Sequence, residues 1–273
     1  MRPAPSALRV TSADPVLGAR SRRASLRIWS GLFAAAAVAW AVTIRRAADM
    51  GAGIGTMGLG LAGFLLLWVV MMAAMMLPSV APTASLYVRT IGTGSRESAR
   101  ALRLAGLVCG YLAAWAAFGV VAFAVAWGAG RLAEAHPRGA AWVGASLLAL
   151  AGVYQLTPFK DVCLRHCRSP LGFLVRFGSY RGRLKDARVG LYHGLYCVGC
   201  CWGLMVVLIT VGVMNLAWMA GLATVVLLEK TWRHGKGFGV AFGAALIALA
   251  LFVPSHPWLV AGIHAGGAAA AGM

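Results

Sequence analysis

The sequence predicts an all-α protein: a polytopic bundle of about seven transmembrane helices, with the N-terminus inside and the C-terminus outside. Of its 273 residues, 60% are hydrophobic and 12% are charged, whereas soluble domains average about 45–50% apolar and about 25% charged residues. The apolar residues also gather in runs close to the roughly 20 residues that a helix needs to cross a bilayer. These two observations exclude a soluble enzyme, a secreted domain and a disordered chain.

Seven apolar segments are the candidate spans. They lie at about residues 28–44, 59–77, 104–129, 139–157, 189–214, 216–229 and 237–253. The sixth is short for a full span, so six spans with a re-entrant segment is the alternative. Asn215 is the expected hairpin tip between the fifth and sixth segments. The pairs Gly106/Gly110 and Gly239/Gly243 predict close helix–helix contacts.

The basic residues alternate between the two ends of these segments. Of the 25 Lys and Arg, 21 fall in the N-terminal tail and in the second, fourth and sixth connections, and 4 fall elsewhere. Because Lys and Arg collect in cytoplasmic loops, this asymmetry places the N-terminus in the cytoplasm and favours an odd number of spans. It also explains the net charge of +18, so we expect the lipid bilayer, and no nucleic acid, as a partner.

The chain divides into three parts by composition. Residues 1–27 are rich in Arg, Ser, Ala and Pro and are expected to form a disordered cytoplasmic tail. Residues 28–253 form the transmembrane helical domain, and residues 254–273 a loose extracytoplasmic tail. The predicted location is the inner (cytoplasmic) membrane of a bacterium, as a multi-pass protein.

Five of the six cysteines fall within one stretch of the chain. They are Cys163, Cys167, Cys197, Cys200 and Cys201. The first two form C-x3-C in the fourth connection, and the other three form C-x2-C-C in the first half of the fifth segment. With the predicted orientation, all lie in the cytoplasmic half, where a reducing environment favours metal binding or redox chemistry over structural disulfides. Cys109 is interpreted as an ordinary small buried residue.

Helical geometry adds a histidine to the second cluster. At 3.6 residues per turn, His193 and the three cysteines occupy one stripe about a quarter of the circumference wide. Thiolate, imidazole and thioether are ligands for Cu(I) or Zn(II) rather than for Mg or Ca. Methionines near the inner end of the second segment lie at a similar depth, although methionine is also ordinary core. The predicted metal ligands are Cys163, Cys167, Cys197, Cys200, Cys201, His193, His166, Met75 and Met76.

Other chemistry is sparse in the sequence. There is no G-x4-G-K-[ST] loop, so no ATP site is expected, and we assign no catalytic residue and no organic cofactor. Tyr154 and Gln155 are expected to contact the Cys163 loop. Glu229 and Lys230 end the sixth segment, where an ion pair or a snorkelling lysine is the expected arrangement.

Three segments resemble a known family. They are Met71–Pro78, Tyr154–Phe173 with the C-x3-C pair, and Gly194–Met205 with the C-x2-C-C cluster. Over about residues 27–253 the chain resembles a bacterial family of predicted metal-binding integral membrane proteins, a domain of unknown function. The resemblance implies a membrane-embedded metal site and carries no activity.

The leading hypothesis is a membrane protein that handles a soft metal, copper first and zinc second. Cys163 and Cys167 would capture or release the ion at the cytoplasmic mouth, in exchange with a cytoplasmic metal donor or acceptor. The second cluster would hold the ion within the bundle. Two alternatives stay open: a thiol redox protein that moves electrons between the two clusters, and a structural metal clip that folds the 159–188 loop onto the bundle.

Overall fold

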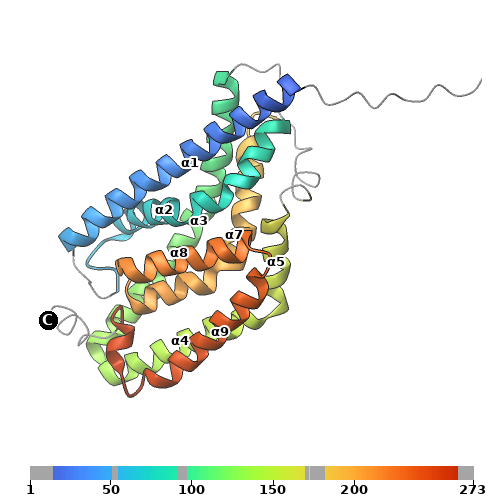
Figure 1. Ribbon diagram of the computed structural model, residues 1–273. Helices are drawn as coiled ribbons and strands as arrows, with labels where there is room; N and C mark the ends of the chain where they lie inside the picture. The colour runs from blue at the N-terminus through green and yellow to red at the C-terminus, as the bar shows by residue number, and fades with distance from the viewer. Residues whose placement is uncertain (1–14, 51–54, 91–96, 170–171, 173–181, 264–273) are drawn as a thin grey trace, which may run out of the picture.

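The chain folds as a bundle of α-helices (Figure 1). The computed structural model describes residues 15–50, 55–90, 97–169, 172 and 182–263, and within these ranges it contains no strand, which confirms the all-α prediction. The helices are α1 (Pro15–Met50), α2 (Leu61–Thr90), α3 (Glu97–Ala135), α4 (Pro137–Leu156), α5 (Pro158–Arg168), α7 (Lys185–Val211), α8 (Leu216–Thr231) and α9 (Gly235–Phe252), followed by the 3-10 turn η1 (Pro257–Val260).

Three helix pairs form the framework of the bundle. α3 runs along α7, α1 along α2, and α4 along α9. The short helix α8 lies between the α1/α2 and α4/α9 pairs (Figure 1) and contacts α2, α7 and α9. α5 packs mainly on α7, at the end of the bundle where α4 ends and α9 begins. This arrangement brings α2, α5, α7 and α8 together at one end of the bundle.

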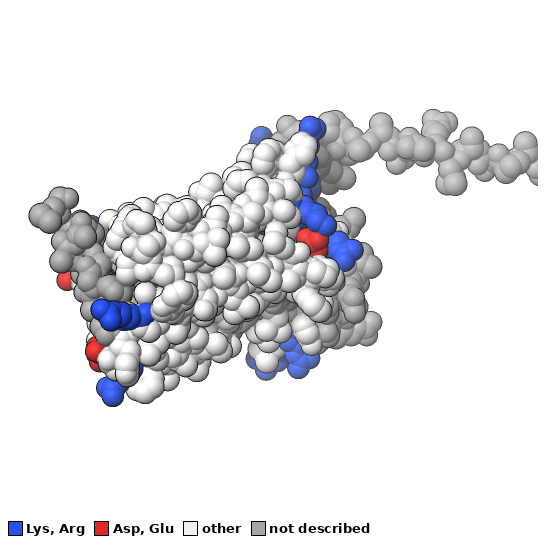
Figure 2. All heavy atoms as spheres, turned by 90° about the horizontal axis from the view of Figure 1, so that it is seen from below, with Lys and Arg blue, Asp and Glu red and all other residues white. Residues whose placement is uncertain are grey.

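Six of the described helices are long and apolar enough to cross a membrane, so the prediction of seven spans is wrong by this measure. The six are Ser25–Met50, Leu61–Arg89, Glu97–Ala135, Arg138–Leu156, Lys185–Val211 and Gly235–Phe252. The expected span at 216–229 corresponds to α8, whose 16 residues rise about 24 Å, less than the roughly 30 Å of a hydrocarbon core. Figure 2 shows charged side chains at the two ends and an uncharged band between them.

The helical domain extends further at both ends than the composition suggested. α1 begins at Pro15, so residues 15–27, expected to be a disordered tail, are helical; residues 1–14 lie outside the described part. At the other end, Val260 and Ile263 are buried, and the Gly55 amide donates to the Gly262 carbonyl at 3.1 Å. The segment after α9 is therefore packed as far as residue 263, and residues 264–273 lie outside the description.

The C-x3-C pair lies on a helix rather than in a loop. Thr157 is extended, with φ −78° and ψ 148°, and the following Pro158 occupies the first turn of α5. A proline disfavours the helical region for the residue before it and suits the first helical position itself. The chain therefore breaks after α4 and restarts at once in a new direction, which lays α5 against α7.

Glycines bring α3 and α7 into backbone contact. A Cβ atom at Gly110 would lie 1.9 Å from the Ala187 carbonyl oxygen, and one at Gly190 would lie 1.9 Å from the Leu107 carbonyl oxygen. Gly243 lies similarly close to the α4 backbone, where a Cβ would be 2.9 Å from the Gly152 carbonyl oxygen. The expected close approach at Gly110 and Gly243 is confirmed. The crossing fixes α7, which carries the second cysteine cluster.

Candidate metal centre

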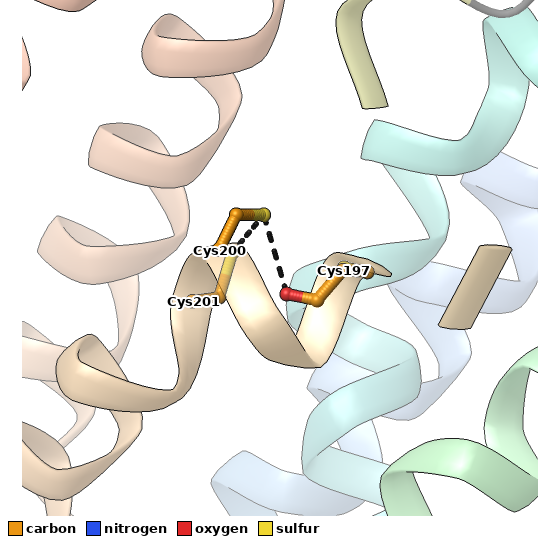
Figure 3. Close-up of side chains that lie close together, drawn as sticks. All are labelled: Cys197, Cys200 and Cys201. Atoms are coloured by element: carbon orange, nitrogen blue, oxygen red, sulfur yellow. Dashed lines mark hydrogen bonds between the residues drawn. The ribbon is translucent and has the colours of Figure 1, made fainter. Parts of the chain in front are cut away.

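Three thiols of α7 converge in the interior. The Sγ atoms of Cys197, Cys200 and Cys201 all lie within 4.8 Å of one another, and all three side chains are buried. The Cys200 Sγ lies 3.3 Å from that of Cys201 and donates to the Cys197 carbonyl oxygen at 3.2 Å, as Figure 3 shows. All six cysteines of the chain are free thiols. Soft donors at this separation suit a Cu(I) or Zn(II) ion.

A fourth thiol reaches this cluster from α5. The Cys167 Sγ lies 3.8 Å from the Cys200 Sγ, and Cys167 is buried. Cys163, one turn earlier on the same side of α5, lies over Gly199 of α7, where a Cβ would be 2.8 Å from the Cys163 Sγ. Cys163 is half-buried. The structure thus brings the two sequence clusters together through Cys167 and leaves Cys163 at the accessible edge.

Tyr154 and Gly199 determine how Cys163 of α5 packs against the bundle. The Tyr154 hydroxyl donates to the Gly199 carbonyl oxygen at 2.5 Å, and the Tyr154 ring lies 4.7 Å from that of Trp202. Because Gly199 has no side chain, the sulfur of Cys163 can approach the α7 backbone. The expected contact of Tyr154 with the Cys163 region is therefore made through α7.

A buried lysine contacts the thiol cluster, which the sequence did not predict. The Lys230 Nζ donates to the Cys197 Sγ at 3.0 Å and to the Ser79 Oγ at 3.2 Å, and Lys230 is only 8% exposed. The Tyr111 hydroxyl lies 3.0 Å from the same Cys197 sulfur. A buried ammonium needs a counter-charge, and a Cys197 thiolate would supply it. Of the two arrangements expected here, the snorkelling lysine is not found, and an ion pair is found for Glu229, with Lys160 as its partner.

A second buried charge network holds α5 in place. The Lys160 Nζ lies 2.5 Å from the Glu229 Oε1, and both side chains are at most 3% exposed. Gln155 of α4 joins them, donating its Nε2 to the Glu229 Oε1 at 3.1 Å and accepting from Lys160. Two neighbouring residues of α8 therefore serve the site differently: Glu229 ties α8 to the start of α5, and Lys230 contacts Cys197.

The two candidate histidines do not lie in the thiol group. His193 is buried one turn before Cys197, and its ring lies 5.9 Å from that of Tyr111. His166 of α5 stacks on Tyr196, with ring centroids 4.2 Å apart, and its Nδ1 lies 2.9 Å from the Val162 carbonyl oxygen. Among the described residues, the ligand atoms within 4.8 Å of one another are thiols alone.

The candidate methionines are buried, and the sixth cysteine is exposed. Met75 and Met76 lie on α2, one turn before Ser79, and both are almost fully buried. Because Ser79 accepts from Lys230, this part of α2 faces the site. Cys109 is exposed on α3, so its expected burial is wrong.

The pKa values of the two thiols of α5 are higher than that of an exposed cysteine. Burial raises the pKa of the Cys163 thiol. Hydrogen bonding to the Cys197 sulfur, reinforced by burial, raises the pKa of the Cys167 thiol. Both are therefore protonated at neutral pH, and a metal that binds them as thiolates must displace their protons.

Three of the site residues that the sequence did not predict share one feature that could have identified them. Lys160, Glu229 and Lys230 are charged residues beside apolar segments, and α8, which carries Glu229 and Lys230 in its last turn, has 16 residues, too few for a full span. A charge that cannot reach water has to find a partner inside the protein. Tyr111 gave no such signal, because tyrosine is common in apolar helices.

Comparison with protein families gives one match. Residues 65–253 match the model of a family described as PpoB2, copper chaperone, which is more than two thirds of the chain. The matched range contains α5, α7 and α8 with all the thiols of the candidate centre. Comparisons with curated proteins and with solved structures find no match.

Proposed function

The chain belongs to this copper chaperone family, and from that premise we propose that it is an integral membrane protein that captures Cu(I) on cysteine thiolates and passes it on. The observation that carries the proposal is the convergence of four thiols from two helices. Cys167 comes from α5 and meets the α7 thiols at Cys200, with their Sγ atoms 3.8 Å apart. Thiolates suit soft ions such as Cu(I) and Zn(II), and the family match favours copper.

The arrangement supports a pathway rather than a single closed site. Cys163 is half-buried at the edge, Cys167 is buried one turn deeper along α5, and Cys200 follows in the interior. An ion that enters at Cys163 would exchange one sulfur ligand at a time along this series. The ammonium of Lys230 would offset the negative charge of a thiolate–Cu(I) complex in a medium of low dielectric.

Composition and shape support a membrane location. Six helices are long and apolar enough to cross a bilayer, and an uncharged band separates the charged ends (Figure 2). The Lys and Arg asymmetry supports a cytoplasmic location for α5 and the start of α7. In this orientation, a bacterial inner-membrane protein would exchange copper with a cytoplasmic donor or acceptor.

An anaerobic Cu(I) titration of the purified full-length protein in detergent, against a coloured Cu(I) chelator, tests the proposal. Wild-type protein should hold at least one equivalent, and Cys200→Ser should lose most of it. Cys109→Ser is the matched control, because Cys109 is an exposed thiol outside the site. Wild-type protein that holds no copper, or a Cys200→Ser variant that binds it as tightly as wild type, would contradict the proposal.

A parallel titration separates zinc from copper. Structural Zn(II) normally takes four protein ligands in a tetrahedron, whereas three of the four thiols here lie on one side of α7, within 4.8 Å of one another. We therefore expect tighter binding of Cu(I) than of Zn(II). Copper that binds but never exchanges with an external chelator would identify the site as a structural clip.

The short distance between Cys167 and Cys200 favours thiol redox chemistry as a second candidate function. One thiol from each sequence cluster would form the disulfide by exchange with the disulfide of a partner, which is reduced to a dithiol, and the reverse step would need an external dithiol that is oxidised in turn. Alkylation of intact cells followed by mass spectrometry distinguishes the two functions. A stoichiometric Cys167–Cys200 disulfide would favour redox chemistry, and reduced thiols would favour copper handling.

A further inference from the structure

The methionines of this chain are concentrated in its core. The sequence has 11 methionines, and seven of those that the structure describes are at most 5% exposed. They are Met71, Met72, Met75, Met76, Met205, Met214 and Met219. They come from α2, α7, α8 and the turn between α7 and α8, which are the elements that meet around the thiol cluster and beyond it.

Two contacts fix the register of α2 against α7. The Tyr87 hydroxyl donates to the Asp186 carboxylate, and Ser79 contacts Lys230, which in turn contacts Cys197. Higher residue numbers in α2 therefore face lower numbers in α7, so the two helices are antiparallel. Positions can then be compared along the bundle, with the level of Cys197 as the origin.

The thioethers continue from the thiols toward the Val211 end of α7. At 1.5 Å per residue, Met75 lies about 6 Å beyond Ser79 along the axis, and Met72 about 10 Å. On the same scale, Met205 lies about 12 Å beyond Cys197. Met219, on antiparallel α8, lies about 16 Å beyond Lys230.

Several of these side chains project into one junction. At about 100° per residue, Met75 and Met72 project within about 40° of the direction of Ser79. Met219 projects within about 20° of the direction of Lys230. Because Ser79 and Lys230 contact each other, these thioethers face the junction of α2 and α8.

The series ends beside a strained backbone segment. Met214 is buried in the turn after α7. Gly262 packs on the end of α7, where a Cβ would lie 2.4 Å from the Gly212 amide nitrogen, and Gly262 accepts from Gly55. Met57, two residues along, has a φ of 56°, which is uncommon for a residue with a side chain. The half-buried thioether of Met57 is thus held near the end of the bundle opposite Cys163.

Thiols and thioethers therefore occupy different parts of the bundle. Every described thiol lies at or before the level of Cys201, and the thioethers extend from there to the Val211 end. A thioether binds Cu(I) as a neutral ligand with no proton to lose, which suits an apolar interior. It also cannot form a disulfide, which matters on a side of the membrane where thiols are oxidised.

We propose that the buried methionines form a Cu(I) pathway that continues from the thiol cluster to the Val211 end of the bundle. The inference rests on the proposed copper function and adds a direction to it. Copper stays in the +1 state throughout. At each transfer between methionines one Cu–S bond to the next sulfur forms and one bond to the previous sulfur breaks, so no electron and no proton moves. At the first transfer the cysteine thiolate that releases the ion regains the proton that the metal displaced.

Liposomes that contain the full-length protein and enclose a coloured Cu(I) chelator test the pathway. The variant is Met72→Leu with Met205→Leu, which keeps the volume of both side chains and, among the thioethers that face the junction of α2 and α8, leaves a gap of about 10 Å between Met75 and Met219. Single Met219→Leu is the second variant. Leu148→Ile is the control, because Leu148 is fully buried on α4 and carries no sulfur.

Cu(I) should reach the enclosed chelator about tenfold more slowly with the double variant, which corresponds to a barrier higher by about 1.4 kcal/mol. Cu(I) binding in detergent should be unchanged, because the thiols are intact, and the control should match wild type in both measurements. Wild-type transfer rates in both methionine variants, or no transfer by wild-type protein that binds copper, would overturn the pathway and leave the proposed function standing. A wild-type protein that binds no Cu(I) would overturn both.

Discussion

Helix α7 makes two contacts of opposite character. Against α3 it packs backbone on backbone through glycines, where a Cβ at Gly190 would meet the Leu107 carbonyl oxygen at 1.9 Å. Against α5 it packs through sulfur atoms, and α5 is held in turn by the buried Lys160–Glu229 pair. The first contact has no freedom to adjust. The second depends on side chains: a buried charge pair, the more exposed Lys236–Asp161 pair and sulfur contacts along a helix of 11 residues, so the chemistry belongs to the α5 side.

The largest expected effect comes from filling the glycine contact. Gly190→Ala should prevent accumulation of folded protein, because the new methyl group meets backbone that cannot rotate away, the severe end of overpacking. The measurement is the yield and thermal unfolding of purified protein. Gly128→Ala is the matched control in α3, since nothing lies within 4 Å of its Cβ position. Equal stability of the two variants would show that the crossing is not rigid.

The next largest effect concerns the pair that holds α5. Removing one partner of a buried ion pair costs about 3–5 kcal/mol, so Lys160→Met should lower stability and release α5. The Cys167 thiol should then react with a maleimide that it resists in wild-type protein. The exchanged pair, Lys160→Glu with Glu229→Lys, should restore part of the protection. A variant that leaves Cys167 protected would show that the remaining contacts of α5, which include the Lys236–Asp161 pair, are enough to hold it.

The same contrast explains what the sequence could predict. Apolar periodicity predicts helices, and glycine pairs predict their close contacts, because both depend on neighbours along one helix. The stripe of Cys197, Cys200 and Cys201 was predictable for the same reason. The partnership of Cys167 with Cys200 was not, since it depends on the turn at Pro158 and on the direction that α5 takes after it.

The prediction for the buried charged residues failed for a different physical reason. For Glu229 and Lys230 the expected arrangement was an ion pair or a lysine that snorkels to water at the end of a span. α8 is too short for that, and its last turn ends inside the bundle, where Lys160 and Cys197 supply the partners. The predicted number of spans was wrong for the same reason. The segment that became α8 looks nearly long enough to span by composition, but its charged end lies inside the bundle beside its partners.

A smaller effect separates the thiols by their access. Cys163 is half-buried and Cys200 is buried, so maleimide should modify Cys163 at least about tenfold faster, because access limits the reaction of a thiol. Mass spectrometry of the metal-free protein after short exposures measures both rates. Equal rates would place the entrance elsewhere, and prior loading with Cu(I) should slow modification at both positions if they share one path.

The last expected effect is the dependence of copper binding on pH. The pKa values of Cys163 and Cys167 lie above the ordinary value for cysteine, so at pH 6 to 8 both carry a proton that Cu(I) must displace. Raising the pH reduces this competition, and the apparent affinity should rise by up to about tenfold per pH unit for each proton released. Cys167→Ser should lower that slope, because the hydroxyl stays protonated and does not replace the thiolate. Cys163→Ser should lower it less if Cys163 binds the ion only in passing, and Cys109→Ser should leave it unchanged. A wild-type affinity that is independent of pH would mean that copper uses sulfurs already ionised in the interior, with Cys197 beside Lys230 as the first candidate, and that α5 only covers the site.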